Sequence, residues 1–442
     1  MNSFLFKNLR PVIFTVLFFL LMSCSNYNSD TTTTPNDFTS MPGEEIIGQI
    51  GLAVAELSSG HASRIGSTFS DQISFCARCC GPPYESYTVS PPDFDVIWSN
   101  AYTDGIANSV YVREYAVANG DTILEGVAMI LQAMLFGEMA ALFGDIPFSE
   151  AGNPLQYPHP RYDPQHLVFS GIQQMLSEAI AKVDSAPVSI SQMEVFTSNE
   201  ARWASIAHSL KARYYLITKD YNNALLEAQR GIGAPNGGLL INHSNTEGAK
   251  NLYFQYTVEQ RKGHIGTCNN PLLFRFLNDT QPRIIYTPGD QSRLYHYFDV
   301  DASVLNTNPG GLIAADANFP VISWVETKLI EAEAAARTGG DALTPFNEVR
   351  AHLEATYEGH FPISSTTDTT LLITEILEEK YISMPLSIQT FHDARRTNDI
   401  LGTLKGDHST IPQRFLYPQA EIDANENFPG IQDLFTPTSV NQ

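Results

Sequence analysis

The sequence predicts a mainly α-helical protein, with paired helices and a loop-rich face that carries a few short strands. Three observations support this prediction. Apolar residues recur at helical spacing in several long segments. Tight turns separate successive segments, which indicates antiparallel pairs. Two stretches, residues 67–92 and 236–320, do not follow the helical period and are rich in Gly, Pro and aromatic residues.

Five segments have the apolar spacing of amphipathic helices. In residues 121–143 the apolar side chains lie three and four positions apart, which places them along one face of a helix. The same spacing recurs in residues 163–184, 197–217, 324–337 and 371–384. Each segment is therefore predicted to be a helix that buries one face in a common core.

Polar residues are predicted to cap several of these helices. Thr122 with Glu125, and Thr197 with Glu200, have the spacing of a capping box. In that motif each side chain bonds the backbone N–H of the other residue. Thr344 is predicted to cap a further helix, which begins at the proline that follows it.

The order of the helices is typical of tetratricopeptide hairpins. Asp220 ends one long helix, and a shorter helix bearing alanines begins at Tyr221. Residues 324–337 and the helix after them form another such pair. We count at least three pairs and expect a fourth. Because the intervals between them are irregular, a degenerate repeat scaffold is predicted rather than a regular solenoid.

Residues 1–23 have the features of an export signal. Lys7 and Arg10 precede an apolar run, and Ser23 lies directly before Cys24. A cysteine at this position predicts cleavage before Cys24 and lipidation of its thiol. The alternative is an ordinary signal peptide with an incidental cysteine. Residues 24–40 are polar and are predicted to be a flexible tether to a single folded body, residues 41–442.

The charge of the chain argues against nucleic acid as a partner. The formal net charge is −22, and removal of Lys7 and Arg10 with the signal would make it more negative. Such a surface repels phosphate backbones and anionic lipids. Neutral or basic ligands fit it better.

Four cysteines follow Cys24: Cys76, Cys79, Cys80 and Cys268. An even number in an exported chain favours disulfides. The alternative is a metal site that joins the first three to Cys268, although structural zinc sites usually have two spaced pairs of thiolates. A bridge from the cluster to Cys268 is the pairing we consider, but the sequence does not identify the partner.

Four segments, in their order and spacing, resemble signatures of the SusD/RagB family across most of residues 41–442. They are residues 141–151, 319–333, 376–397 and 411–425. The resemblance implies a helical lipoprotein with four tetratricopeptide-like pairs that binds nutrients and is not an enzyme. It implies glycans as the most favoured ligands, with peptides as the alternative. It also implies a SusC-like TonB-dependent outer-membrane transporter as partner and an anchored position facing the cell surface.

The loop-rich segments supply the candidate ligand-binding residues. Sugar rings stack their apolar faces on aromatic side chains, while their hydroxyls bond with polar neighbours. Aromatic and polar residues of this kind occur together in both segments. They are Tyr84, Tyr87, Tyr253, Tyr256, Arg275, Asn278, Arg293, Tyr295 and Tyr297. The alternative is that some of them, Tyr295 and Tyr297 above all, are strand residues that pack on the scaffold. Strand-like runs are predicted at residues 283–286 and 294–300.

No motif predicts catalysis or a cofactor. The sequence lacks a Gly-x-Ser-x-Gly elbow, a His-Glu-x-x-His helix and a phosphate-binding glycine loop. Glu378 and Glu379 are neighbours on a predicted helix, so they cannot both face one cleft as a catalytic pair. With Arg395 and Arg396 they are predicted to form a buried ionic network. Two less favoured hypotheses are a glycan-cleaving enzyme and a structural transporter subunit without a ligand.

Overall fold

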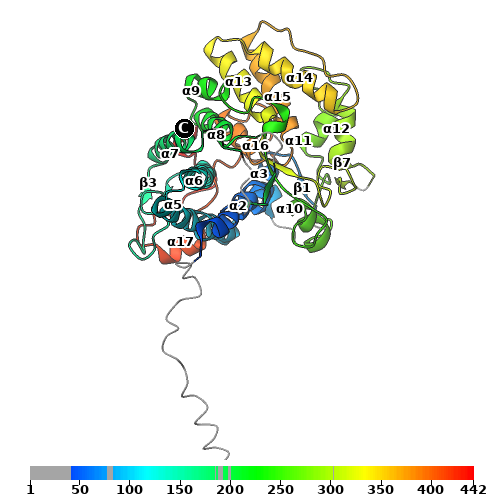
Figure 1. Cartoon of the computed structure of the whole chain (residues 1–442). Helices are drawn as coiled ribbons and strands as arrows, with labels where there is room; N and C mark the ends of the chain where they lie inside the picture. The colour runs from blue at the N-terminus through cyan, green and yellow to red at the C-terminus, as the bar shows by residue number, and fades with distance from the viewer. Residues whose placement is uncertain (1–40, 77–82, 185, 188–192, 198–200, 302) are drawn as a thin grey trace, which may run out of the picture. The chain divides into compact units, whose positions relative to one another are not determined.

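The structure is a computed structural model, and it describes residues 41–76, 83–184, 186–187, 193–197, 201–301 and 303–442. The predictions for residues 1–40, Cys24 among them, and for Cys79 and Cys80 lie outside these residues. From Gly43 to Gln442 the chain forms one unit, and helices make up most of it, as predicted (Figure 1).

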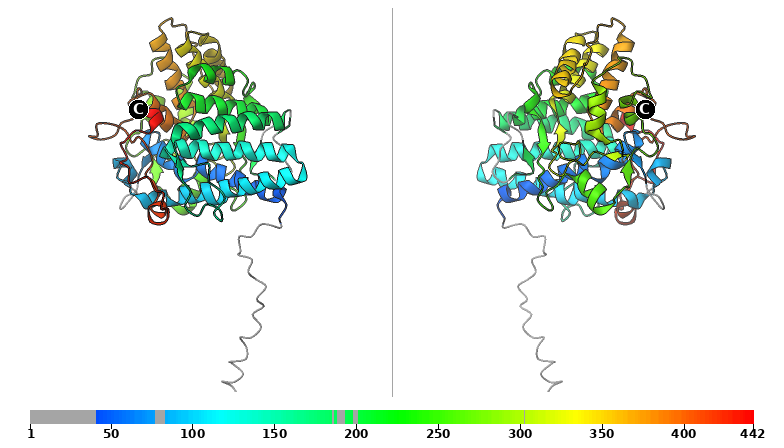
Figure 2. Two further views of the ribbon diagram at one scale, coloured as in Figure 1. Left: turned by 90° about the vertical axis from the view of Figure 1, so that its left-hand side faces the viewer. Right: turned by 90° about the vertical axis from the view of Figure 1, so that its right-hand side faces the viewer.

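The first half of the body is a stack of helices in chain order, and the left-hand view of Figure 2 shows them lying side by side. Successive long helices pack on one another, and the segment from Asp95 to Asn119 runs without a break through an α-helical, a π-helical and a second α-helical part. The stack consists of α2 (Gly43–Ser59), α3 (His61–Phe69), α4 (Asp95–Ser99), the π-helix η3 (Asn100–Ile106), α5 (Ala107–Asn119), α6 (Thr122–Phe143), α7 (Gln165–Val183), α8 (Trp203–Ile217) and α9 (Tyr221–Ala228).

The later helices continue the stack, because α9 packs on α13 and α13 on α15. The pairs α6–α7, α8–α9, α13–α14 and α15–α16 are the tetratricopeptide-like hairpins. The remaining helices are α10 (Leu252–Phe254), the π-helix η5 (Gln255–Gln260), α11 (Leu272–Leu277), α12 (Asp290–Tyr297), α13 (Trp324–Thr338), α14 (Leu343–Thr356), α15 (Thr369–Ser383), α16 (Gln389–Arg396) and α17 (Gln419–Ala424). Short 3-10 turns are η1 (Pro83–Ser86), η2 (Pro91–Phe94), η4 (Pro235–Gly237) and η6 (Ser439–Asn441).

Helix α6 is the core of the stack. Within the described residues it is the one helix long and apolar enough to cross a membrane, but all of its apolar window is buried inside the protein. Helices α2, α5 and α7 surround it. Gly137 lets the ring of Tyr214 approach, and the Tyr214 hydroxyl donates to the carbonyl of Met134 at 3.2 Å.

At two predicted helix starts, a nearby aspartate accepts the backbone N–H bond that had been assigned to a threonine. The carboxylate of Asp121, not Thr122, accepts from an N–H in the first turn of α6. Thr344 lies inside α14 and donates both its N–H and its hydroxyl to Asp341. A carboxylate accepts more strongly than a hydroxyl and takes the position nearest the free N–H groups. Thr197 was also wrongly assigned, because it lies in strand β4 before α8 begins.

Nine short strands form three small antiparallel sheets in the described residues. One has the order β1-β6-β8-β7, another pairs β2 with β3, and the third has the order β4-β5-β9. The strands are β1 (Ser74–Phe75), β2 (Ile146–Pro147), β3 (Tyr162–Asp163), β4 (Phe196–Thr197), β5 (Leu239–Ile241), β6 (Ile265–Gly266), β7 (Phe298–Asp299), β8 (Val304–Leu305) and β9 (Phe319–Ile322).

Both strand-like runs in the second loop-rich segment were assigned incorrectly. Residues 283–286 form no strand, and residues 294–297 belong to α12, so that only β7 remains of the second run. Tyrosine-rich runs favour strands locally, but burial of Leu294 and Tyr297 on one helical face decides the outcome here.

The predicted ionic network is two separate networks. Glu379 is fully buried and pairs with three arginines, Arg283, Arg293 and Arg350. These arginines hold the pKa of Glu379 well below its usual range despite its burial. Arg396 instead pairs with Glu333 on α13 at 2.5 Å.

Arg395 makes no ion pair with Glu378 or Glu379. Its guanidinium donates to the backbone carbonyls of Ala141 and Gln413, at 2.8 and 3.0 Å. It thereby joins α16 to the end of α6 and to the C-terminal segment.

Candidate ligand-binding site

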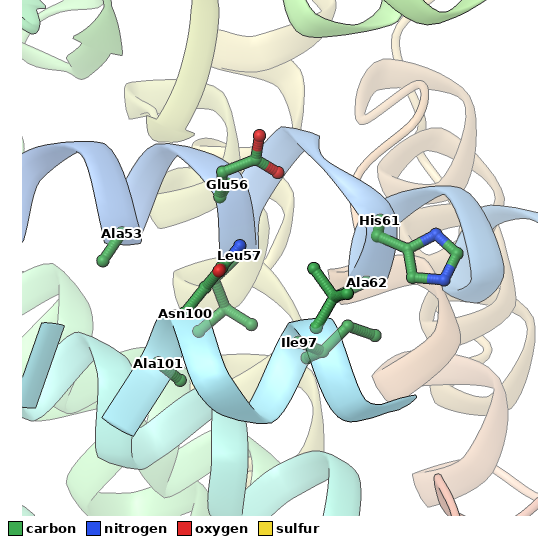
Figure 3. A pocket seen from close by; sticks show the side chains of 9 residues that line it. Ala53, Glu56, Leu57, His61, Ala62, Ile97, Asn100 and Ala101 are labelled. Atoms are coloured by element: carbon green, nitrogen blue, oxygen red, sulfur yellow. The ribbon is translucent and has the colours of Figure 1, made fainter. Parts of the chain in front are cut away.

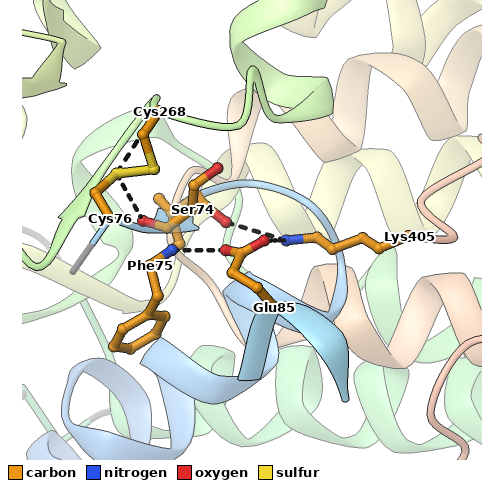
Figure 4. The surroundings of a disulfide bond; sticks show 7 residues. Ser74, Phe75, Cys76, Glu85, Cys268 and Lys405 are labelled. Atoms are coloured by element: carbon orange, nitrogen blue, oxygen red, sulfur yellow. Dashed lines mark hydrogen bonds and ion pairs between the residues drawn. A yellow bond between two sulfur atoms is a disulfide. The ribbon is translucent and has the colours of Figure 1, made fainter. Parts of the chain in front are cut away.

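The two loop-rich segments meet beside α3. A disulfide between Cys76 and Cys268 joins them, with Cα atoms 5.6 Å apart (Figure 4). Strand β1 pairs with β6 next to this bridge, and the Cys76 N–H donates to the carbonyl of His264 at 2.7 Å. The disulfide prediction is therefore confirmed for this pair, and neither sulfur is available to a metal.

Ion pairs fasten the same junction. Arg275 lies 3.1 Å from a carboxylate oxygen of Asp71, which ties α11 to the end of α3. Lys405 pairs with Glu85 at 3.0 Å, and Glu85 accepts the N–H of Phe75 at 2.6 Å (Figure 4). Contacts from three distant parts of the chain thus hold the loops on the rigid helices.

Aromatic rings line the junction. The ring of Phe75 packs edge-on against Tyr84, with centroids 5.0 Å apart, and reaches Tyr256 on the other side at 6.5 Å. The His61 ring lies 6.1 Å from Tyr84. Tyr84 comes from the first loop-rich segment and Tyr256 from the second, so two of the predicted binding residues are brought together here.

Arg64 is the charged centre of this cluster. Its guanidinium carbon lies 4.3 Å from the centre of the Tyr256 ring, in cation–π geometry. Its Nε is buried without a hydrogen-bond partner, and Arg64 makes no ion pair with any residue that the structure describes. Arginine N–H groups that are withdrawn from water are normally paired, and Arg64 is a partly buried residue whose Nε is not. A donor of this kind in a loop junction indicates a place for a ligand.

Burial shifts the pKa values of Arg64 and of the titratable groups near it. It lowers the pKa of Arg64, an effect opposed by Tyr253 and Glu56. Burial raises the pKa of Glu56, and the charge of Arg64 acts in the opposite direction. Desolvation and the Arg64 charge lower the pKa of His61 to about 4. His61 is consequently neutral at pH 7, and Glu56 is the carboxylate whose charge acts on Arg64.

A groove of about 810 Å³ begins at Glu56 and runs between α2 and the segment that follows β5. Gln255, the neighbour of Tyr256 in the chain, lies in its wall. Its lining mixes apolar, amide and acidic side chains: Glu45, Gln49, Leu52, Ala55, Glu56, Glu194, Val195, Ile241, Asn242, His243, Ser244, Lys250, Leu252 and Gln255. We call this groove, together with Arg64 and Tyr256 beside it, the Arg64 groove.

A second hollow near Glu56 is too small for a ligand. It lies between α2, α3 and α4, and its volume of about 10 Å³ is the space of one water molecule. Figure 3 shows its largely apolar walls, with the carboxylate of Glu56 pointing away from them. The carboxylate of Glu56 is therefore counted with the larger groove, whose wall it also lines.

Comparison with known proteins identifies the family. Residues 35–265 match the SusD-like family model described as starch-binding and associating with the outer membrane. The chain belongs to the SusD-like family. No curated protein sequence matched it.

Solved structures of SusD-like proteins share the whole fold. A SusD/RagB family protein from Bacteroides thetaiotaomicron aligns over 88% of this chain and 95% of its own, with a TM-score of 0.66 and 17% identity. A chitin-binding protein aligns over 90% and 99%, with a TM-score of 0.68 and 17% identity. A chitin-binding SusD homologue from Flavobacterium johnsoniae aligns over 90% and 98%, with a TM-score of 0.66 and 13% identity.

Several predicted ligand residues of this SusD-like protein are core residues. Tyr84, Tyr87, Tyr253 and Tyr297 are each at most 5% exposed and pack inside the body. The hydroxyl of Tyr297 donates to a carbonyl of α15, and that of Tyr87 accepts the N–H of Lys405. Since both faces of these rings are covered, they offer no stacking surface, and their assignment as ligand contacts is corrected.

Three polar residues that were predicted to bind a ligand instead bond to other residues of the scaffold. Arg293 is fully buried in the Glu379 network. Arg275 is engaged with Asp71. The side chain of Asn278 accepts from Thr280 in the turn that ends α11. Tyr295 differs from them, because it is 56% exposed on α12, apart from the Arg64 cluster.

Arg64, Glu56 and His61 were not singled out from sequence. A hint was present, since Arg64 is the one acid or base other than histidine in the α3 sequence HASRIGSTF. Its importance depends on Tyr256, which lies almost two hundred residues away in the sequence. Sequence spacing carries no information about that contact.

The Arg64 groove provides interactions for binding. Glycosidases hold two carboxyl groups about 5–10 Å apart. The groove wall contains three carboxylates, and two of them, Glu45 and Glu56, are eleven residues apart on α2, roughly 16 Å along the helix. Stacking on the Tyr256–Arg64 pair and hydrogen bonds to the amide side chains are the interactions that the geometry provides.

Proposed function

We propose that this protein captures glycan oligomers at the outer membrane without cleaving them and delivers them to a SusC-like TonB-dependent transporter. The observation that carries the proposal is the Arg64–Tyr256 pair, in which a partly buried arginine without an ion pair among the described residues contacts the chain neighbour of Gln255, a residue of the groove wall. Its N–H groups suit sugar hydroxyl and carbonyl oxygens. A cleft with mixed apolar and amide walls matches the two-sided character of a sugar ring.

The family and its solved members support a glycan. The family description names starch, and two of the similar structures are of chitin-binding proteins. Chitin and starch oligomers are neutral, so they would not be repelled by a chain with a net charge of −22.

The anchored position completes the proposal. Cleavage before Cys24 and lipidation of its thiol would tether the body through residues 24–40 and keep it on the cell surface. There it would cover the mouth of the transporter and release its ligand inward. Moderate affinity suits this role, because a tightly held ligand would not be passed on.

A basic peptide is the alternative ligand. The groove carries the carboxylates of Glu45, Glu56 and Glu194 against the single ammonium of Lys250. That ammonium is already paired with Glu259 at 2.5 Å. Complementary charge would draw cationic peptides to this groove.

Calorimetric titration of residues 41–442 tests the proposal. The probes are chitohexaose, maltoheptaose and a lysine-rich hexapeptide. We expect saturable binding of one of the two glycans and recovery of that glycan uncleaved. Arg64→Ala should weaken binding by about tenfold or more, since it removes charge-assisted hydrogen bonds together with the stacked cation.

Two controls separate loss of the site from loss of the fold. Arg230→Ala removes an exposed arginine on the scaffold and should bind like the wild type. Arg64→Lys keeps the charge but loses the planar group, so it should recover only part of the affinity. Unchanged binding in a folded Arg64→Ala variant would contradict the assignment of the site. Peptide binding alone would favour the alternative, and shortened glycan would show an enzyme.

A further inference from the structure

Only two Tyr, Trp or Phe side chains are exposed in the part of the chain that the structure describes. They are Tyr286, 67% exposed, and Tyr295, 56% exposed. All described Trp and Phe side chains are at least partly buried. Single exposed aromatics need no explanation, but these two lie close in sequence, on either side of the start of α12.

A pocket of about 140 Å³ opens beside Tyr286. Phe276 and Leu277 give it an apolar floor, and both are less than 5% exposed. Asp279 and Gln291 stand at its rim as exposed polar groups. A cavity of about 150 Å³ is large enough for benzene, so this pocket can hold one six-membered ring.

The wall of the pocket contains an unused hydrogen-bond donor. Arg283 lines the pocket and is held in place by Asp290 at 2.8 Å and by Glu379 at 2.9 Å. Its Nε is buried without a hydrogen-bond partner. The nearest carboxylate oxygen, from Glu378, is 3.8 Å away, which is too far for a hydrogen bond.

Helix α12 connects the pocket with the second exposed ring. Gln291 at the pocket rim and Tyr295 are four residues apart on this helix, so their side chains lie on the same face, one turn from each other. Tyr286, Gln291 and Tyr295 thus form a strip in which two flat rings flank an amide. We call this strip, with its pocket, the α12 surface.

We propose that the α12 surface is a second sugar-binding site, distinct from the Arg64 groove, that takes one pyranose ring of a neutral glycan in the pocket and a further ring on Tyr295. The apolar floor contacts the ring face, and Asp279, Gln291 and Arg283 bond its hydroxyls. The exposed carboxylate of Asp279 disfavours acidic sugars. The inference rests on the proposed capture of glycans and adds a second point of contact for a long chain.

Two sites on one protein should produce a preference for long oligomers. A chain held at one site meets the second at a high effective concentration, provided that it is long enough to reach. Both α10, beside the Arg64 groove, and α12 lie on the right-hand side of the molecule in Figure 1.

Nitration of tyrosine rings by tetranitromethane tests the second site directly. Exposed Tyr286 and Tyr295 should be nitrated in the free protein, as read by peptide mass spectrometry. Chitohexaose or maltoheptaose, whichever the protein binds, should protect Tyr286. In Arg64→Ala the protection should persist at higher glycan concentration, because the two sites are separate.

Titration of variants provides the second measurement. Tyr286→Ala should weaken binding of the long glycan by about tenfold, since a stacked ring contributes of that order. It should leave the Arg64-dependent binding of a disaccharide unchanged. Leu155→Ala, which removes another highly exposed side chain, is the matched control and should have no effect.

The outcomes separate this inference from the proposed function. Glycan binding that neither protects Tyr286 nor changes in Tyr286→Ala would overturn the second site while the proposed function stands. Protection of Tyr286 without any effect of Arg64→Ala would support the second site and contradict the Arg64 groove. Failure of both glycans to bind would overturn both.

Discussion

Removal of the Cys76–Cys268 disulfide should lower the stability of this protein severely. The bridge closes a loop of 192 residues, which spans most of the helical stack from the end of α3 to α11. In the chain-entropy model, stabilisation grows with the logarithm of loop length. A loop of this size corresponds to about 5 kcal/mol at 25 °C. Total domain stability is typically about 5–15 kcal/mol, so the loss would be a large fraction of it.

The double variant Cys76→Ser/Cys268→Ser removes both thiols of this bridge, so neither can pair with another cysteine. Equilibrium urea unfolding, followed by circular dichroism, should show a much lower midpoint than the wild type. Reductant should lower the wild-type midpoint to the same value and leave the variant unaffected. Glycan affinity should fall as well, because β1 and β6 lose the covalent link that holds both loops beside Arg64.

A loss below about 1 kcal/mol would refute the reasoning. It would mean that the unfolded chain is already constrained in this region, so that the bridge removes little of its freedom. A reductant effect on the double variant would show instead that another thiol contributes.

Three further predictions concern separate parts of the chain. In the folded protein, burial raises the pKa of Glu378 from 4.5 to about 7. The folded state therefore holds this proton more tightly than the unfolded state does, and the protein loses stability as the pH rises from about 4.5 to about 7. Glu378→Gln should therefore match the wild type near pH 4 and unfold at higher urea at pH 8; equal midpoints at pH 8 would contradict the pKa. Gly137→Ala should cost about 1–3 kcal/mol, because the new methyl group overlaps the Tyr214 ring; an unchanged melting temperature would show that the ring has room to move. Cys24→Ala should release the protein from the membrane fraction of cells that lack the proposed transporter partner, and retention there would exclude the lipid anchor.

The scaffold was predictable because its helices are long and regular. Residues 121–143, 163–184 and 324–337 matched α6, α7 and α13 to within two residues at each end. A helical period repeated over several turns is a local property of the sequence. The apolar face of such a helix can be buried against any neighbouring element, so the prediction does not depend on which element that is. The N-terminal caps were less predictable. Asp121 and Thr122 compete for the same N–H groups, and only the backbone angles of the helix start decide between them.

Most of the candidate site was not predictable in the same way. Tyr256 was predicted because aromatic and polar residues occur together in the loop-rich segments. The same reasoning also predicted Tyr84, Tyr253 and Tyr297, which are buried in the core. An aromatic ring suits a core as well as a sugar. Local sequence cannot distinguish the two cases, because exposure depends on segments from elsewhere in the chain.

The sequence by itself determined the helical scaffold, the family signatures and the presence of two irregular segments on which binding residues could lie. Only the tertiary structure decided which candidate residues are exposed, buried or unpaired. Arg64 matters because Tyr256 covers its guanidinium and no described carboxylate pairs with it. Tyr286 stands exposed beside a pocket that combines the apolar side chains of Phe276 and Leu277 with polar and charged ones. Helical periodicity is encoded within a few turns of chain, whereas burial and charge pairing arise from contacts between residues far apart in sequence.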